Sequence, residues 1–555
     1  MGSPERQKIM ELVSQHVKGI MEECKLRARD HGLVFDDETL EYVVTNRDMI
    51  ELSPKVMIPT LYDYWVHDVR VLSGKGMYEA YPSNPYETVI NTRPAISFYN
   101  DNNPDWLNVM IFYHVLGHID FFQNNLFYKN TWDIDLTGQA LSDKRVIAQL
   151  RSEKGRWVDY AIEFARGVDN LVGYHKELNH TIQKDTRQAM TKTDFYFDIF
   201  LQVIKHVSHN TYLKEITRYN KANDGNEDFF EQILSRYPEF EELYRKQLMS
   251  QIPPALDVME YITRHSSFLK EAENEWMKTV LQIVKNTSLY FQPQIRTKIM
   301  NEGWASYWHE YLFMRDDRIC GHEIDYARVN AGVTSMPKVG LNPYALGMRL
   351  FEHIEHMEDR GCYSFEYRFL KDEVRKKGFD LNKGTGKEYI LKVRENFNDF
   401  TFINTFIDQE FVSQHDLFVA GKRFNNERMS WQYYIKSKKA EDYKDMIIDT
   451  LYHPPQISVD PSGTRNGVLY LNHKFEGKPL KIDFIENTMI GIEFLWGGPV
   501  HLETSEVVRP GQPADSFANF WDPSSPAAVK KAPEPVKWKR MVYVMENRKI
   551  HKREL

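Results

Sequence analysis

Two histidines and one glutamate in this chain have the residue types and the spacing of a metal site. His114 and His118 lie four residues apart in an apolar run, so both imidazoles leave the same face of a helix. Glu302 lies in a second apolar run, where a buried carboxylate must meet a cation, a metal ion or a dense set of hydrogen bonds. A metal ion held by these three side chains is the leading hypothesis, and packed core histidines are the alternative.

The elements that would position these residues are helices. Asn103 and the proline after it mark the start of one helix, and Pro293 and Pro343 mark the starts of two others. Gly303, inside a helical pattern, predicts the close approach of another backbone. Apolar residues recur at helical spacing in five segments, namely residues 8–30, 103–125, 254–285, 293–314 and 343–359.

The fold class that these patterns predict is mainly α with a small β-containing C-terminal module. Alternation of apolar and polar residues predicts strands at 467–473, 480–484 and 500–504. The proline-rich, basic end of the chain is expected to be extended or disordered. We predict a helical core with the metal site at residues 1–370, followed by a linker with a helical segment at 371–455. A small β or α/β module at 456–508 and this tail at 509–555 complete the chain.

The composition is that of an ordinary soluble protein. The formal net charge of -8 gives no general nucleic-acid footprint, so no nucleic-acid partner is expected. Cys24, Cys320 and Cys362 lack CxxC spacing, which disfavours a disulfide framework and a thiolate zinc site. The sequence shows neither the apolar core of a signal peptide nor an apolar run that could span a bilayer. We therefore expect a cytoplasmic protein without an integral membrane segment.

Three sequence blocks resemble the signature blocks of the bacterial stage V sporulation protein R (SpoVR-like) family. They are residues 300–309 (MNEGWASYWH), 114–125 (HVLGHIDFFQNN) and 340–347 (GLNPYALG), and further similarity extends over residues 57–507. The resemblance implies a cytosolic bacterial protein associated with formation of the spore cortex, or with stress or stationary phase in bacteria that make no endospores. Its partner would be a substrate or a protein related to the cell wall.

The two site segments are also similar to those of gluzincin peptidases, which use HExxH on one helix and a glutamate on a second, in some groups within EGWALY. This resemblance implies a gluzincin-like helical core in which His114, His118 and Glu302 bind a divalent metal, with zinc as the first expectation and an open position for water. Val115 stands where the peptidases have their general base, and valine cannot accept a proton. Iron or manganese, as in two-His one-carboxylate oxygenases, and a structural metal therefore remain alternatives.

Other residues near these segments are candidates for catalysis. Asp120, His309 and Glu310 are the nearest candidates by sequence for a base that replaces the missing glutamate. His309 lies seven residues after Glu302, so it could also be a fourth ligand, a residue that orients Glu302, or a core histidine. For Asp120, a helix cap or a salt bridge is the alternative.

Two tyrosines are candidates for the substrate site, and two further histidines are not. Tyr307 and Tyr344 are candidates for substrate contact, although the aromatic residues of 304–311 are more typical of core packing. His353 and His356 are expected at the surface, because they flank an acid on a charged helix.

The leading functional hypothesis is a metal-dependent hydrolase that acts on an amide-type bond in a precursor of the cell wall or the spore envelope. The amide bond rests on the resemblance alone. A non-haem iron oxidase that uses the same triad is one alternative, and a non-catalytic, metal-stabilised partner protein is the other.

Overall fold

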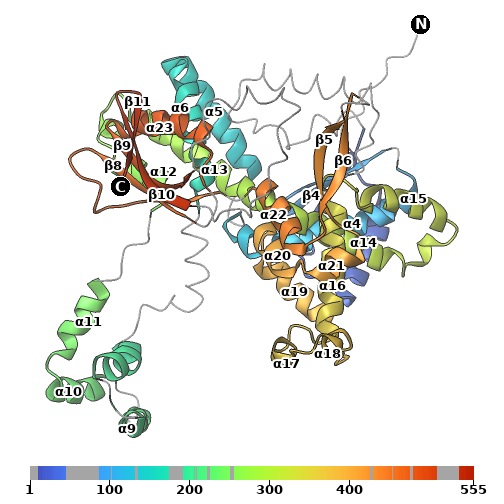
Figure 1. Cartoon of the computed structure of the whole chain (residues 1–555), viewed down its shortest axis with the longest axis horizontal. Helices are drawn as coiled ribbons and strands as arrows, with labels where there is room; N and C mark the ends of the chain where they lie inside the picture. Colours follow the sequence, from blue (N-terminus) through green and yellow to red (C-terminus); the bar gives the residue numbers. More distant parts are fainter. Residues whose placement is uncertain are drawn as a thin grey trace, which may run out of the picture.

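The computed structural model describes residues 11–45, 87–101, 103–131, 136–173, 192–205, 207, 209–221, 226–249, 256–425, 429–452, 454–475, 479–508 and 537–555. The chain is mainly helical with a β-sheet near its C-terminal end, as predicted. Figure 1 shows two larger bodies and a smaller helical lobe. Within the described ranges, none of the helices is both long and apolar enough to cross a membrane.

The first body is built around three packed helices. α14 (Lys298–Phe313) lies between α4 (Asp105–Asn124) and α16 (Pro343–Asp359) and packs closely on both. A four-stranded sheet of order β1-β2-β4-β3 and further helices surround them. These surrounding elements are β1 (Glu11–Leu12), α1 (Gln15–Asp30), β2 (Thr39–Val44), β3 (Glu87–Ile90), β4 (Ala95–Asn100), η1 (Leu126–Thr131), η5 (Asp317–Ile319), α15 (Glu323–Thr334), α17 (Phe365–Phe369), α18 (Glu373–Lys377), α19 (Gly386–Asn396), α20 (Asp399–Phe406), α21 (Gln409–Gln414), β5 (Val419–Asn425), β6 (Ser430–Ser437) and α22 (Ala440–Thr450).

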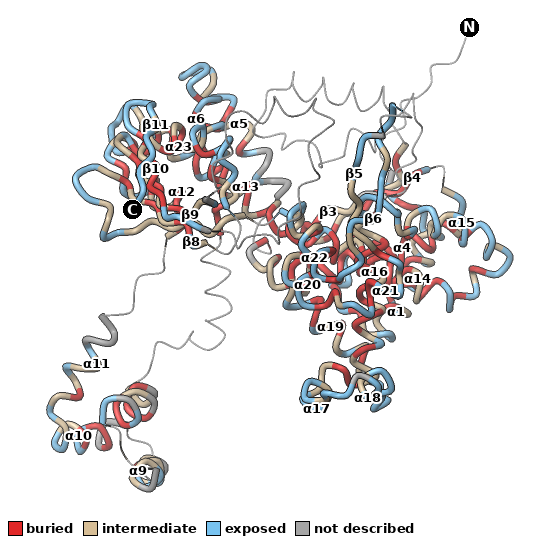
Figure 2. Tube along the Cα trace, viewed as in Figure 1, coloured by how far each residue is buried: buried red, intermediate tan, exposed pale blue. Residues whose placement is uncertain are grey.

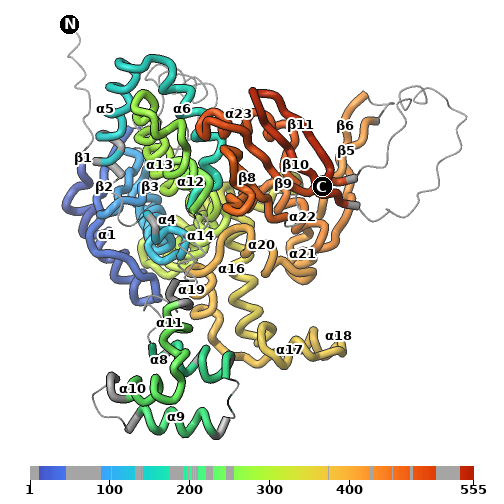
Figure 3. The backbone as a smooth tube through the Cα atoms, turned by 90° about the vertical axis from the view of Figure 1, so that its left-hand side faces the viewer, coloured from blue at the N-terminus to red at the C-terminus, as the bar shows by residue number. Residues whose placement is uncertain are grey.

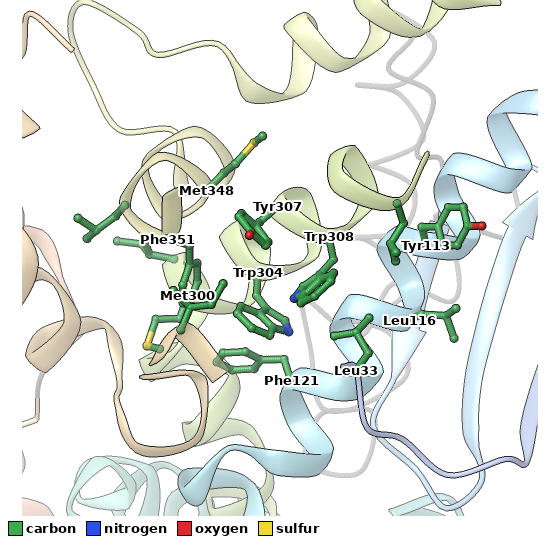
Figure 4. Close-up of a cluster of buried hydrophobic side chains, with 14 of the residues drawn as sticks. Leu33, Tyr113, Leu116, Phe121, Met300, Trp304, Tyr307, Trp308, Met348 and Phe351 are labelled. Carbon is green, nitrogen blue, oxygen red and sulfur yellow. The ribbon is translucent and has the colours of Figure 1, made fainter. Parts of the chain in front are cut away.

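Aromatic side chains fill the space between α4, α14 and α16. Trp304 and Trp308 are fully buried, with ring centroids 5.6 Å apart. Phe351 of α16 packs on Trp304 at 5.0 Å, and Phe121 of α4 lies beside the same ring (Figure 4). The packing role predicted for the aromatic residues of α14 is therefore confirmed for Trp304, Trp308 and the buried Tyr307.

Two glycines let α14 approach its neighbours at backbone distance. A Cβ atom on Gly303 would lie 2.3 Å from the backbone of Gly347, so no larger residue fits there without a shift of α16. A Cβ atom on Gly117 would lie 2.8 Å from the Cα atom of Ala305 in the same way. The close approach predicted at Gly303 is confirmed, and the Gly117 contact brings the turn of α4 that carries both site histidines against α14.

The second body packs helices on a five-stranded sheet of order β11-β10-β9-β8-β7. β8 and β9 are parallel and α23 connects them, whereas the other neighbours are antiparallel. Its elements are α5 (Leu136–Lys154), α6 (Trp157–Arg166), η2 (Asp169–Leu171), α12 (Val258–His265), η4 (Phe268–Lys270), α13 (Trp276–Arg296), β7 (Gln456–Val459), β8 (Leu469–Lys474), α23 (Ile482–Trp496), β9 (Val500–Val508), β10 (Lys537–Glu546) and β11 (Lys549–Glu554).

The lobe has an aromatic core of its own and projects from the two bodies in both views (Figures 1 and 3). Phe195, Tyr196, Phe200, Phe230 and Phe240 form the centre of this core. Its elements are α8 (Lys192–Asp194), the π-helix η3 (Phe195–Ile204), α9 (His209–Lys221), α10 (Asn226–Arg236) and α11 (Phe240–Met249).

The predicted C-terminal tail is wrong for residues 537–554, which form β10 and β11. Tyr543 and Met545 are buried in the core of the second body, and burial of these apolar side chains outweighs the basic residues around them. Residues 509–536 of the predicted tail lie outside the described part of the chain. The segment 371–455, predicted as a linker with a helical segment, contributes α19 and α20 to the core of the first body.

Three local predictions also differ from the structure. Residues 480–484, predicted as a strand, include the start of α23, whose buried Ile485, Met489 and Ile492 recur at helical spacing. Residues 254–285 hold two helices rather than one. They separate near Ser266, whose hydroxyl donates to main-chain carbonyls at the end of α23. Pro293 lies inside α13, and the helix of Glu302 begins at Lys298.

Candidate metal centre

His114 and His118 of α4 meet Glu302 of α14 at the interface of the two helices. His114 Nε2 and His118 Nε2 are 3.1 Å apart, and His118 Nε2 is 3.6 Å from Glu302 Oε2. One potential ligand atom from each residue lies within 4.8 Å of the other two. Within the described residues, these three form the one group of His, Cys, Asp or Glu side chains with such spacing.

Hydrogen bonds fix which ring nitrogens of His309 and His114 carry a proton. Asn330 Nδ2 donates to Glu310 Oε2 at 2.7 Å, so Asn330 Oδ1 faces His309 Nε2 at 2.9 Å and accepts its proton. A neutral His309 then has a lone pair on Nδ1, which accepts a proton from His114 Nδ1 at 2.9 Å. The remaining nitrogen of His114, Nε2, therefore carries a lone pair toward His118.

His118 reaches the same state through a different neighbour. Its Nδ1 donates to Asn301 Oδ1 at 2.9 Å, so in the neutral imidazole its Nε2 also carries a lone pair. The carboxylate of Glu302 lies beside that nitrogen. Three electron-pair donors thus converge with no proton between them, and a cation would satisfy all three.

Burial keeps the interior histidines neutral. His114 is 4% exposed and His309 is 1% exposed. Burial lowers the pKa of His114 well below its ordinary value, and the imidazoles of His118 and His309 lower it further. Burial also lowers the pKa of His309. Neutral imidazole is the form that binds a metal.

Glu302 and His118 open the site to solvent. Their side chains are 14% and 11% exposed, respectively, so the expectation of a fully buried Glu302 is wrong. A small ligand would reach the triad from this side.

The donor set and its spacing fit a zinc ion. Two donors that each lie about 2.1 Å from a tetrahedral zinc ion are about 3.4 Å from each other. The separations of 3.1 and 3.6 Å lie on either side of that value. The second ring nitrogen of each histidine bonds to a protein group, as is usual for metal-bound histidines. Iron and manganese accept the same types of ligand.

The start of α14 is held by α20. Ile299 N and Met300 N donate to the two carboxylate oxygens of Asp399, both at 2.9 Å. Burial raises the pKa of Asp399 to about 7, although these hydrogen bonds act in the opposite direction. This contact fixes the turn of α14 that leads into Asn301 and Glu302.

Asp120 takes part in a buried network elsewhere in the core. Its carboxylate accepts from Trp304 Nε1 at 2.8 Å and from Val34 N at 2.7 Å, and it lies 3.3 Å from Arg394 Nε. The salt-bridge alternative for Asp120 is therefore confirmed, and this carboxylate is not part of the triad.

The other predicted site residues lie outside the triad, at different distances from it. Glu310 binds Asn330, and Tyr307 donates to Glu355 Oε2 at 2.5 Å and contacts Lys387. The ring of Tyr344 lies nearly parallel to that of His114, at an angle of 19° and a centroid distance of 6.2 Å. Of the two predicted substrate contacts, Tyr344 is the one beside the triad.

Sequence reasoning missed Asn301 and Asn330. Asn301 directly precedes Glu302 in the motif, which was a usable signal, whereas nothing in the sequence around Asn330 points to the site. The surface position predicted for His353 is wrong. His353 is 5% exposed on the inner face of α16 and lies 3.3 Å from Asp408 Oδ2, whereas His356 is exposed as predicted.

The chain was compared with known proteins. The model for "SpoVR like protein" matches residues 11–453, a range that includes the whole triad. The chain is also 21% identical over 389 residues to "Uncharacterized protein YcgB" of Escherichia coli (strain K12), and the match covers 68% of this chain and 69% of that protein. No solved structure matches the chain significantly. Because the family match spans most of its length, this chain belongs to the SpoVR-like protein family.

Proposed function

We propose that this protein is a metal-dependent enzyme whose ion is held by His114, His118 and Glu302. The observation that carries the proposal is the convergence of three unprotonated donors whose remaining ring nitrogens are engaged by protein groups. Zinc is the first candidate because these ligand types and this spacing suit it, and iron and manganese are the alternatives.

A divalent metal at such a site acidifies a water molecule and polarises a carbonyl group. The chain supplies the orientation. Both ring nitrogens of His309 are engaged, so His309 orients His114 rather than serving as a fourth ligand. Tyr344 lies beside the ring of His114, and this position supports its proposed contact with a substrate.

The proposed substrate is an amide-type bond in a precursor of the cell wall or the spore envelope. Two observations support it, namely membership in the SpoVR-like family and the similarity of the α4 and α14 motifs to those of gluzincin peptidases. A gluzincin-like core is part of the same proposal.

A second candidate is a non-haem iron oxidase that uses the same three ligands. The observation that favours it is Val115, which is fully buried at the position of the peptidase base and can take no proton. Two imidazoles and one carboxylate are the ligands of non-haem iron oxygenases, whose reaction with dioxygen does not need that base.

Metal analysis tests the site. Protein purified without a metal-affinity resin should contain about one zinc, iron or manganese ion per chain. His118→Ala and Glu302→Ala should lose it. His356→Ala, which changes an exposed histidine of α16, is the matched control and should keep it. Wild-type protein without stoichiometric metal would refute the proposal.

Activity separates the two candidates. The hydrolase predicts release of an amine from peptides of cell-wall precursors, which chelation abolishes and zinc restores. The oxidase predicts bound iron and consumption of dioxygen that is lost in Glu302→Ala. Metal-loaded protein with neither activity would support a structural ion instead.

A further inference from the structure

The hairpin β5–β6 forms a sheet of its own within the described part of the chain. Val419–Asn425 pairs with Ser430–Ser437, and neither strand joins the other two sheets. Figure 1 shows this ribbon standing away from the helices of the first body, and Figure 2 shows exposed residues along much of it. A two-stranded hairpin is marginally stable alone in water, so a second surface would stabilise it.

One face of the ribbon is apolar. Residues directly opposite in an antiparallel pair share a face, which places Phe424 with Trp431 and the exposed Tyr433 beside Lys422. Phe424, Trp431, Tyr433 and Ile435 are 43%, 66%, 55% and 52% exposed. The rings of Phe424 and Trp431 lie 5.4 Å apart, so the exposed side chains are contiguous. A contiguous exposed apolar patch of this kind marks an interaction site.

The charges on the ribbon have one sign. The two strands carry Lys422, Arg423 and Lys436 and no acidic residue, although the whole chain has a net charge of -8. Lys422 shares the face of the aromatic residues, Arg423 lies on the opposite face according to the alternation of the strands, and Lys436 lies at the register shift, where it has no opposite partner. The ribbon therefore combines exposed apolar side chains with basic ones, and its charge is complementary to an anionic surface.

We propose that the β5–β6 ribbon docks on the surface of an anionic lipid bilayer. Tryptophan and tyrosine favour the boundary between headgroups and acyl chains, and basic residues around them bind anionic headgroups. The exposed aliphatic residues, Ile435 and the 76%-exposed Met429 near the turn, suit acyl chains and cannot stack on nucleic-acid bases.

Co-sedimentation of the full chain with vesicles tests the proposal. Wild-type protein should bind vesicles of phosphatidylglycerol and phosphatidylcholine, should bind vesicles of phosphatidylcholine alone much more weakly, and should be released by high salt. Phe424→Ser combined with Trp431→Ser should abolish binding. Arg423→Glu combined with Lys436→Glu should weaken it by at least about 25-fold, because each basic residue near an anionic surface contributes about fivefold.

A matched control lies at the opposite end of the first body in Figure 1. Phe365 of α17 and Val374 of α18 are 75% and 80% exposed, and both lie near basic residues. Phe365→Ser combined with Val374→Ser should leave vesicle binding unchanged. Thermal unfolding of every variant should match the wild type, since all these side chains are exposed.

Several outcomes would overturn the proposal. One is wild-type protein that does not sediment with anionic vesicles. The others are ribbon variants that bind vesicles like the wild type, and wild-type binding that does not depend on the charge of the lipids. Titration with a single-stranded oligonucleotide and measurement of the oligomeric state complete the test. Loss of oligonucleotide binding or of a dimer in the ribbon variants, with no vesicle binding in the wild type, would assign the ribbon to those partners instead.

Discussion

Asn330 acts on His114 through His309 without touching it, and the backbone of Ala305 also bonds the ring of His114. The amide orientation of Asn330 is fixed by Glu310, and through His309 this orientation leaves His114 Nε2 free of a proton. A proton on that nitrogen would block the triad. The binding of a cation therefore depends on a side chain from α15, a helix that contributes none of the three ligands.

Asn330→Leu should lower the affinity for zinc by about 10- to 100-fold, because His309 loses the acceptor that fixes its tautomer. Competition with a chromogenic chelator measures the change. Asn286→Leu, which removes an amide that accepts a hydrogen bond from Gln282 on α13, away from the triad, should leave the affinity as in the wild type. Equal affinities in all three proteins would show that the hydrogen bond between Asn330 and His309 does not affect zinc binding.

Asp120→Asn should destabilise the first body by about 3–5 kcal/mol, because it leaves the buried guanidinium of Arg394 without its counter-charge. Urea unfolding measures the loss. The folded variant should still carry the same amount of metal, since Asp120 is not part of the triad. Loss of metal from a stable variant would contradict this assignment.

At the scale of elements, the contacts of α14 place the site. Gly303 and Gly117 allow close approach to α16 and α4, and Asp399 holds the first turn. Because each contact involves the backbone, the position of Glu302 relative to His114 is set by rigid elements rather than by flexible side chains.

Gly303→Ala should destabilise the protein by at least about 1–3 kcal/mol, because the added methyl group collides with the backbone of Gly347. Gly332 of α15 is the matched control, since a Cβ atom there meets nothing within 4 Å. Gly332→Ala should raise stability by about 0.5–1 kcal/mol. Denaturant unfolding of the two variants distinguishes close packing from helix propensity.

Asp316 should make the packing of α4 sensitive to acid. Despite burial, hydrogen bonds from Arg318 and Tyr113 lower the pKa of Asp316 to about 2. A lowered carboxyl pKa adds stability above pH 4 that disappears as the pH falls toward 2, here about 2 kcal/mol. Asp316→Asn should therefore be less stable than the wild type at pH 7, and urea unfolding should show this deficit shrinking below pH 4.

The sequence predicted those elements whose ends are set locally. Residues 343–359 form α16 as predicted because Asn342 caps the helix and Pro343 occupies its first turn. The helix start predicted at Pro293 is wrong because a proline can also lie inside a helix, as it does in α13. The triad could be predicted since its histidines share one helix face, whereas Asn330 reaches the site through the packing of α15, which no local pattern encodes.

At the scale of the whole molecule, the chain has separate hydrophobic cores. The core of the first body surrounds the triad, and that of the second lies under the C-terminal sheet. Tyr543 and Met545 of β10 belong to the second core, so the last strands complete a body that contains no triad residue.

A stop codon after Val508 should unfold the second body and spare the first. Removal of β10 takes two buried side chains, Tyr543 and Met545, from the second core and leaves the edge of β9 unpaired. Thermal unfolding should lose one of two transitions, and the remaining transition should still shift upward with zinc. Loss of metal binding in the truncated protein would show that the two bodies depend on each other.

The contacts that build the site join distant parts of the chain. His114 and His309 are 195 residues apart in sequence, and His118 and Asn301 are 183 apart. Closing such loops costs entropy, and contacts of long sequence separation form slowly. The proposed donor set therefore needs these long-range contacts to form first. An ion bound by the triad would be acquired late in folding, after α15 has been synthesised and packed, and it would mark a core that has finished folding.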